Sequence, residues 1–526
     1  MDTFTTMMRL FLIVLSMLLL VQGPQILNAQ RIVYSDPETA DTRRLNYEII
    51  GKVGGKFLIF KNNRLRSWIS VLDEDMQSLG REEIGYMPSN EKTLNVDFFP
   101  YADYAWMIYQ YQRRNVIYCM AAQLDGNGKR MGELIELDTT HLSFSSDNKL
   151  YAVVSSEDRK RIAVFKINSS DRDEYRMSKL LFNEKLVPMG RAEVLIPMSD
   201  RGDQLGDFAL DNQGDLLFSR FLRGNNDNIT KASILVLPAS QSRLQETPLP
   251  VGENGPFLDE IKIKIDNVNQ RYILTSLYSK ERRSGIDGCF FYVWDKQTRQ
   301  PVVNLLHEFS DELRQEAKGN ATARTAFNDF FIRQIIVKRD GGFIVGSEAY
   351  YTTSRANNWN RYDYIYGSPF MGFNNFYYSS PYYNRYWWGS SPAFGWGMPG
   401  GRTNAAVRYH ADNIMVQSYD PVGQLQWSRV VAKTQFDDEV DDLLSFNMMV
   451  LGGELHLLYN QQDRRDKLLN DFALQPAGEL IRNTDLKNLE KGHQFMPVRG
   501  KQVSARQLII PTVYRSYICF AKLEYN

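Results

Sequence analysis

Cysteine and histidine are scarce in this sequence, which has three of the first and five of the second among 526 residues. So few side chains leave little material for a zinc site or a disulfide framework, and we predict neither a metal site nor a cofactor. The formal net charge is zero, because the 62 lysine and arginine residues are balanced by 62 aspartate and glutamate residues. No overall field therefore draws the chain to nucleic acid or to an anionic membrane surface.

Long hydrophobic runs are missing beyond the N-terminus. The run LFLIVLSMLLLV at residues 10–21 is shorter than the roughly 20 residues that a membrane-spanning helix needs. Gly23-Pro24 follows it, and Ala29 then supplies the small residue typical of a signal-peptide cleavage site. We predict a secretory signal peptide over residues 1–29, cut before Gln30, in preference to an N-terminal membrane anchor. The mature chain is then expected to be exported, to the periplasm or the outer surface, without a transmembrane segment.

Local catalytic motifs are missing too. The sequence contains no G-x-S-x-G elbow, no H-E-x-x-H pair and no phosphate-binding P-loop. We therefore predict no catalytic residue and favour a protein without enzymatic activity.

What the sequence has in abundance is a repeated β-strand pattern. Eight units can be aligned, each with apolar strands separated by tight turns that contain Gly, Asn or Asp. The third strands of the units end at Leu72, Leu124, Ile167, Leu237, Trp294, Tyr419, Leu474 and Leu523. Most of these ends lie about 40 to 60 residues apart, near the length of a four-stranded propeller blade. The pattern predicts an all-β fold, a β-propeller over residues 30–526, with eight blades, or seven if two weak units share one.

The ends of the chain predict how the ring closes. The last unit, residues 493–526, supplies only three strands, and a lone strand at Arg31–Ser35 precedes the first full unit. Pairing this N-terminal strand with the last blade would close the ring and remove an exposed sheet edge. Two β-sandwiches are the alternative fold, because they also use short strands with regular turns. They would not explain units that align along the chain.

One stretch points to a class of proteins. KRDGGFIVGSEAY at residues 338–350 resembles the repeats of secreted bacterial β-propeller proteins, notably those of Bacteroidota. The resemblance covers one blade well and the others loosely, and it identifies no specific family. It implies a secreted bacterial propeller and brings no catalytic residues with it.

The three cysteines all fall in third strands. Cys119, Cys289 and Cys519 belong to units two, five and eight. Blades so far apart in a ring would not bring Cα atoms within the roughly 7 Å that a disulfide tolerates. We expect buried free thiols.

The largest departure from the repeat is an insertion in blade six, at residues 352–411. Its centre is dense in Tyr, Phe and Trp, nearly uncharged, and has the periodicity of neither a strand nor a helix. Tyr and Trp give a large contact area at little cost in conformational entropy. A dense exposed aromatic patch needs a cover, which favours a partner over a passive loop. The residues predicted to contact a partner protein or a glycan are Trp359, Tyr362, Tyr364, Trp387, Trp388 and Trp396.

These features favour a non-enzymatic exported propeller that acts as a protein-binding or scaffolding module in the cell envelope. Its partner would be an envelope protein or a glycan, not nucleic acid, and the oligomeric state stays open. The alternative is a carbohydrate-binding or carbohydrate-active propeller of the glycosidase or lyase kind, which needs no local motif. A pair of Asp or Glu side chains with Arg or Tyr beside them at the central channel would favour that enzyme.

Three smaller features of the sequence each predict a local structure. Ser310 is the predicted N-cap of a short helix that Gly319 ends. The acidic run at 437–442 lacks the spacing of known calcium loops and is predicted to be a solvated charge run. His456 lies inside a strand and is expected to be a hydrogen-bonded structural histidine.

Overall fold

The computed structural model describes most of the chain after residue 29. The described ranges are 30–37, 46–63, 66–88, 93–142, 150–171, 174–198, 202–224, 227–252, 255–319, 322–354, 407–438, 441–463, 466–483, 486–487, 489–490, 492–515 and 517–525. The predicted signal peptide at 1–29 and the centre of the predicted insertion, 355–406, lie outside them. Within these ranges no helix is long and apolar enough to cross a membrane.

Most of the described strands form antiparallel units in which four strands follow one another in chain order, and β1 (Gln30–Tyr34) also pairs in parallel with β32 (Leu486–Lys487), which follows the seventh unit. The first unit is β2 (Asn46–Val53), β3 (Lys56–Asn62), β4 (Ser67–Leu72) and β5 (Ser78–Glu83). The second is β6 (Thr93–Pro100), β7 (Tyr104–Arg113), β8 (Val116–Asp125) and β9 (Arg130–His141). The third is β10 (Tyr151–Ser155), β11 (Arg161–Asp171), β12 (Glu174–Asn183) and β13 (Pro188–Pro197).

The fourth and fifth units are joined into one sheet of nine strands. They are β14 (Asp203–Leu210), β15 (Leu216–Arg223), β16 (Ile229–Leu237), β17 (Gln245–Pro248), and β19 (Lys262–Asp266), β20 (Arg271–Ser279), β21 (Gly288–Asp295), β22 (Gln300–Glu308). The short strand β18 (Phe257–Leu258) pairs with both β16 and β20 and so makes the connection. Because of this joint sheet, the count of eight blades, or seven, stays a prediction.

The remaining units complete the ring. The sixth is β23 (Phe330–Val337), β24 (Phe343–Ser354), β25 (Val407–Tyr419) and β26 (Leu425–Val431), with β27 (Phe436–Asp437) beside β25. The seventh is β28 (Phe446–Leu451), β29 (Glu454–Asp463), β30 (Asp466–Leu474) and β31 (Leu480–Asn483), followed by β32 (Leu486–Lys487). The last unit holds β33 (His493–Phe495), β34 (Lys501–Ser504), β35 (Gln507–Tyr514) and β36 (Tyr517–Glu524).

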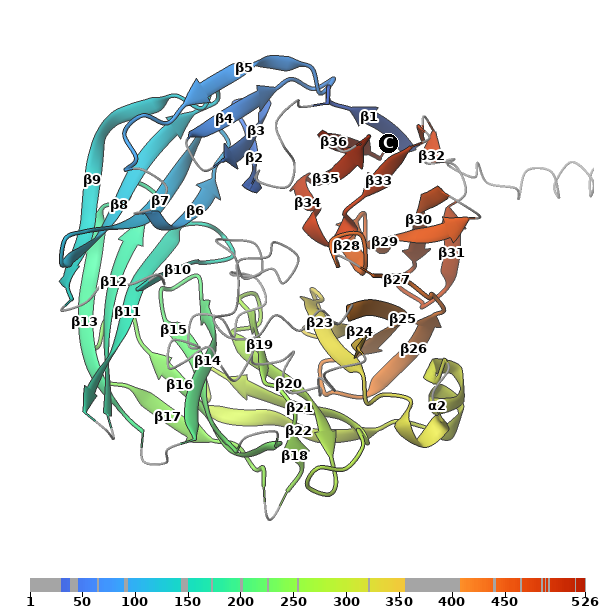
Figure 1. The fold of residues 1–526 in the computed structure, drawn as a ribbon. Coiled ribbons are helices and arrows are strands. Elements are labelled where there is room, and N and C mark those ends of the chain that lie inside the picture. The colour runs from blue at the N-terminus through green and yellow to red at the C-terminus, as the bar shows by residue number, and fades with distance from the viewer. Residues whose placement is uncertain are drawn as a thin grey trace, which may run out of the picture.

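The sheets stand around a common centre, and the chain passes from one to the next around the ring (Figure 1). The first strand of each unit lies nearest the centre, and several of these inner strands contact the inner strand of the next unit. This radial arrangement is that of a β-propeller and differs from two sheets packed face to face. The predicted fold class is confirmed.

The N-terminal strand closes the ring, as predicted. β1 (Gln30–Tyr34) pairs antiparallel with β36, from Arg31 opposite Glu524 to Tyr34 opposite Ala521. Figure 1 shows the blue β1 among the red strands of the C-terminus. Pairing β1 with β36 gives the last unit its outer strand and covers the edge that β36 would otherwise expose.

At this closure, a buried carboxylate accepts hydrogen bonds from residues near both ends of the chain. The side chain of Asp471 on β30 accepts hydrogen bonds from the side-chain amide of Gln30, from the Tyr525 hydroxyl at 3.2 Å and from the Asn483 amide at 3.1 Å. Nδ1 of His456 lies 3.0 Å from each carboxylate oxygen. His456 and Asp471 are both buried. His456 is therefore a hydrogen-bonded structural histidine, which confirms that prediction.

The hydrophobic core lies in the seams between neighbouring sheets. Phe60 on β3 and Phe98 on β6, for example, bring their ring centroids to 5.1 Å between the first and second units. Phe57 packs with Ile509 and Phe520 where the last unit meets the first. Burial therefore continues around the whole ring, including the seam at which the two ends of the chain meet.

The cysteines belong to this core. Cys119, Cys289 and Cys519 are buried and free. Cys119 lies in the seam between the second and third units, and Cys289 in the seam between the fifth and sixth. The prediction of buried free thiols is confirmed.

The short helix predicted between the fifth and sixth units is present. α2 (Asp311–Ala317) begins after Ser310, whose Oγ accepts the Leu313 amide hydrogen at 3.2 Å. Gly319 follows with φ +52°, in the left-handed region that glycine adopts easily. Two single turns of 3-10 helix, η3 (Ala323–Thr325) and η5 (Pro497–Arg499), complete the helical elements of the described residues.

Removal of the N-cap should loosen this helix. Ser310→Ala takes away the acceptor for the Leu313 amide, at a cost of about 1 kcal/mol in helix stability. We expect amide hydrogens of residues 311–317 to exchange about five times faster than in the native chain. Ser310→Thr keeps an acceptor and serves as the control. Equal exchange in the two variants would contradict the capping role.

Candidate functional site

Because neighbouring strands run in opposite directions, successive connections lie on opposite faces of the ring. Turns that follow the first and third strands of a unit lie on one face, and connections that follow the second and fourth strands lie on the other. We call the first the tight-turn face. The second, the loop-bearing face, holds the ends of β24 and β25 at Ser354 and Val407, and it receives the long connections between β22 and β23 and between β26 and β28. Long connections on a rigid scaffold are where binding sites concentrate, so this face is the candidate functional face.

The tight-turn face repeats one hydrogen-bonding arrangement. An Asp or Asn opens the turn, and its side-chain oxygen accepts the backbone amide hydrogens two and four residues later. The residue three positions on has a left-handed φ between +56° and +96°. The arrangement occurs at Asp73, Asp125, Asn183, Asp211 and Asp420. These side chains satisfy the amides of their own turns, which keeps the turns short.

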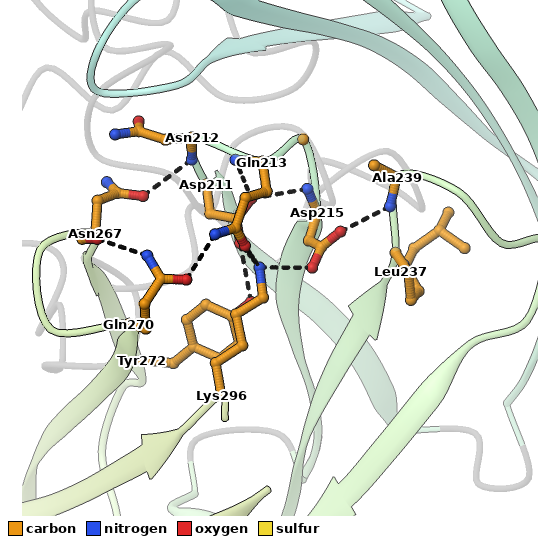
Figure 2. Close-up of polar contacts among 12 residues, drawn as sticks. Asp211, Asn212, Gln213, Asp215, Leu237, Ala239, Asn267, Gln270, Tyr272 and Lys296 are labelled. Atoms are coloured by element: carbon orange, nitrogen blue, oxygen red, sulfur yellow. Dashed lines mark hydrogen bonds and ion pairs between the residues drawn. The ribbon is translucent and has the colours of Figure 1, made fainter. Parts of the chain in front are cut away.

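A cluster of charges ties two units together on the tight-turn face, as Figure 2 shows. Nζ of Lys296 lies 2.5 Å from Asp211 Oδ2 and 2.8 Å from Asp215 Oδ2. The Tyr272 hydroxyl donates to the same Asp211 oxygen at 3.1 Å, and burial raises the pKa of Tyr272, which keeps the hydroxyl protonated. Lys296 of the fifth unit bridges two carboxylates of the fourth, so we interpret the cluster as a structural tie between these units.

On the loop-bearing face, the sixth unit projects a long pair of strands. β24 and β25 pair as far as Ser354 and Val407, with one register shift between Glu348 and Tyr350. The ends of the predicted insertion at 352–411 are therefore strand residues. Its remainder, 355–406, lies outside the described residues, as do all six predicted contact residues, Trp359, Tyr362, Tyr364, Trp387, Trp388 and Trp396. We call the strand ends that carry this segment, residues 350–354 and 407–411, the root.

The root presents aromatic and charged side chains. The rings of Tyr351 and His410 stack at 4.5 Å with 5° between their planes. Arg408 makes two hydrogen bonds to Asp438, of 2.6 and 3.0 Å, and lies 4.7 Å from the centre of the Phe436 ring. Burial lowers the pKa of His410, so its ring is neutral near pH 7. Phe436, 52% exposed, is the most open of these aromatic side chains.

Beneath the root lies a buried ionic network. Glu348 on β24 is fully buried, and its carboxylate lies 2.8 Å from Lys433 Nζ and 3.0 Å from Arg333 Nε. Ser445 donates its hydroxyl hydrogen to the same carboxylate. Burial acts to raise the pKa of Glu348, but Lys433 and Arg333 outweigh it and hold the pKa below its usual value. Lys433 also donates to the carbonyl oxygen of Ala411 at 2.6 Å, so the network holds both strands of the root.

Further hydrogen bonds and an ion pair link the residues near this network to the last unit of the ring. Tyr350 donates to Asp441 at 3.0 Å, and Arg499 of the last unit pairs with Asp442. Asp442 is 8% exposed, and burial raises its pKa. The prediction that the acidic run at 437–442 is solvated is therefore wrong for Asp442. Its partner lies 57 residues further along the chain, a distance at which the sequence gives no indication of pairing.

Acidic side chains also meet on the inner strands of the fourth to sixth units. Glu260, just before β19, accepts the amide hydrogen of Ile332 at 3.1 Å and lies 3.0 Å from Lys262 Nζ. Asp207 on β14 accepts the amide hydrogen of Ile263. Sequence reasoning missed these groups and Glu348 alike. For Glu348, one signal was present: it is a lone charge in the otherwise uncharged strand FIVGSEAY.

Comparison with known proteins identifies no family. No family model matches the sequence, and no curated protein matches it. Among solved structures, a polysaccharide lyase shares 10% identity over 84% of this chain and 91% of its own, with a TM-score of 0.38. The β-propeller domain of the Trilobed protease from Pyrococcus furiosus shares 9% identity over 83% of this chain and 95% of its own, with a TM-score of 0.36.

A third similar structure is the oligopeptidase B of Leishmania major. It shares 8% identity and a TM-score of 0.36 over 90% of this chain, which spans 54% of that enzyme. Similarities at this level carry no argument about activity. The β-propeller fold itself rests on the strand order, the seams and the closure described above.

Proposed function

We propose that this β-propeller is a non-enzymatic binding or scaffolding module of the cell envelope, exported by its N-terminal segment, with a partner protein bound at the loop-bearing face. The observation that carries the proposal is the buried Glu348 network under the root. It fixes both strands from which the aromatic segment 355–406 departs. A rigid base beneath a long connection is the arrangement by which scaffolds present binding segments.

The composition of the segment supports a contact role. Trp359, Trp387, Trp388 and Trp396, with Tyr362 and Tyr364, are the proposed anchors, because Trp and Tyr dominate the energy of protein interfaces. The described surface beside the root is aromatic as well, with Phe436 of β27 half exposed next to Arg408 of the root.

The ion pairs of Glu348 and Glu260 support binding over catalysis. Acid–base cleavage of a glycoside uses two carboxyl groups that are both available to the substrate. Glu348 is engaged by Lys433, Arg333 and Ser445, and Glu260 by Lys262 and the Ile332 amide. These charges serve the packing of the protein. A glycan in place of a protein is the alternative ligand, because aromatic faces also stack on sugar rings.

The test replaces residues 355–406 with a short Gly-Ser linker between Ser354 and Val407, whose backbones are already paired. The variant should unfold in the same thermal transition as the intact chain 30–526. We expect one envelope protein to be recovered with the intact chain and lost with the variant. The purified protein should then bind at least tenfold more weakly when the six anchors are changed to alanine.

Tyr517→Ala is the matched control, because Tyr517 is an exposed aromatic residue on β36, outside the root and the segment. It should bind the partner as the intact chain does. Recovery of the same partner by the linker variant, or of none by either chain, would contradict the proposal. Binding of a purified glycan that depends on the same six residues would select the alternative ligand.

A further inference from the structure

The outer strand of the third unit, β13, is the open edge of a sheet. Among the described strands it pairs with β12 alone, so it ends the four-stranded order of its unit. It lies on the outside of the ring (Figure 1) and is ten residues long, PMGRAEVLIP. Proteins usually keep such edges short or cover them, because the outward-facing backbone groups can pair with a further strand. The edge of β13 is therefore a candidate interaction surface.

The two faces of β13 differ in burial. Ala192, Val194 and Ile196 pack into the seam with the fourth unit. The alternate residues point to the other face, where the apolar side chains of Met189 and Leu195 are 49% and 48% exposed. Exposed apolar side chains on an edge strand favour burial by a second strand, which would cover them and satisfy the backbone at the same time.

Two charged residues lie between these apolar residues on the exposed face. Arg191 and Glu193 form an ion pair with each other at 3.0 Å, and their side chains are 57% and 48% exposed. An ion pair so open to solvent contributes little to stability. Both charges can therefore exchange this contact for partners on a neighbouring strand at little cost.

The side chains of β13 are complementary to those of a second β13 in one antiparallel register. With Ala192 opposite Ala192 of a second copy, Arg191 lies opposite Glu193. Met189 lies opposite Leu195 in the same register. Each pair then occurs twice, because the two copies are related by a two-fold axis. The next registers in either direction place Arg191 opposite Arg191 or Glu193 opposite Glu193, and like charges directly opposite each other destabilise a pair of strands.

We propose that β13 is a homodimer interface, at which two copies of this chain pair edge to edge and antiparallel with Ala192 on the two-fold axis. The pairing uses up both edges, so the assembly stops at two copies. Pro188 and Pro197 lack a backbone N–H and limit the pairing to the stretch between them. Because the paired strands run in opposite directions, the loop-bearing faces of the two copies point in opposite directions. The dimer does not depend on the partner proposed above.

The test is the oligomeric state of the chain 30–526, measured by sedimentation velocity at concentrations up to about 0.1 mM. An interface of one strand from each copy is small, so we expect a weak dimer in exchange with monomer. Arg191→Glu and Glu193→Arg each place like charges opposite each other at two positions. Either change should weaken the dimer at least about tenfold. A native chain that stays monomeric over this range would overturn the proposal.

Mixing the two variants tests the register itself. A chain with Arg191→Glu carries two glutamates, and a chain with Glu193→Arg carries two arginines, so the mixture should form a dimer that neither variant forms alone. The double variant Arg191→Glu, Glu193→Arg should dimerise as the native chain does, because the charges again alternate. A mixture and a double variant that both stay monomeric would contradict this register.

A matched surface pair in the first unit provides the control. Arg66 lies 3.3 Å from Glu83 of the outer strand β5, and both side chains are more than half exposed. Arg66→Glu should leave the dimer unchanged. All three single variants should unfold in the native thermal transition, because the changed side chains are exposed. A dimer that persists unchanged in Arg191→Glu and in Glu193→Arg would place the interface elsewhere and refute the role of β13.

Discussion

Glu348→Ala is expected to lower the free energy of unfolding by about 3 to 5 kcal/mol at neutral pH. The substitution leaves Lys433 and Arg333 facing each other beneath the root, and the Lys433 side chain is only 1% exposed. A buried charge without its partner costs far more than the pair contributed, because its lost hydration is no longer compensated. Chemical denaturation at pH 7 measures the loss.

A surface pair provides the control for this prediction. Glu308 lies 2.6 Å from Lys280, and both side chains are more than half exposed. Glu308→Ala should therefore change the free energy of unfolding by about 1 kcal/mol or less. Removing both buried charges with Glu348→Gln and Lys433→Met should recover part of the loss. Equal effects at positions 348 and 308 would show that the network does not stabilise the root.

The contribution of Glu348 to the free energy of unfolding depends on pH in a defined direction. The pKa of Glu348 is lower in the folded chain than its ordinary value of 4.5. Its contribution to stability is thus present above about pH 4.5 and is lost as acid protonates the carboxylate. The native chain and Glu348→Ala should converge in stability as the pH falls below that value.

Asp471→Ala is expected to open the ring at its closure and to cost about 3 to 5 kcal/mol. The buried carboxylate accepts hydrogen bonds from Gln30 on β1, from Tyr525 near the C-terminus and from the Asn483 side chain, and it orients His456. Its removal takes the acceptor away from these donors, of which Gln30 and Tyr525 are buried. We expect β1 to detach before the rest of the protein unfolds, and to become sensitive to protease and to hydrogen exchange.

The adjacent residue on β30 is the matched control. Asn470 is also nearly buried, but its side chain contacts Gln461 and Arg482 instead of the two ends of the chain. Asn470→Ala should cost about 1 kcal/mol and leave β1 protected. If β1 stays equally protected in Asp471→Ala, the carboxylate does not hold the closure.

The repeat architecture was predictable because its causes are local. Tight turns need Gly, Asn or Asp at fixed places, and these marked the strand ends along most of the chain. The closing strand was predicted at Arg31–Ser35 and observed at Gln30–Tyr34. Ser310 marked the start of α2 for the same reason, since an N-cap acts within one turn of its own helix.

The networks were not predictable because their partners come from separate units. Glu348 meets Lys433 and Ser445 only after β24, the 432–445 connection and β28 have come together. The two-residue strands β18 and β27 likewise have no periodicity to detect and exist only through pairing. The charge of Asp442 was read as solvated for the same reason: Arg499 belongs to another unit.

The closure of the ring has a consequence for how the protein is made. β1 is among the first strands to be synthesised after the N-terminal segment, yet its partner β36 is the last strand of the chain. The earlier units can pack against one another as they emerge, but the seam between the first and last units has to wait until β36 has been made. Until then β1 has no partner, and the seam between the first and last units is open to water. A chaperone that shields nascent chains would therefore find its exposed apolar surface at Phe57 and Trp68 of the first unit, which are covered only when Ile509 and Phe520 arrive.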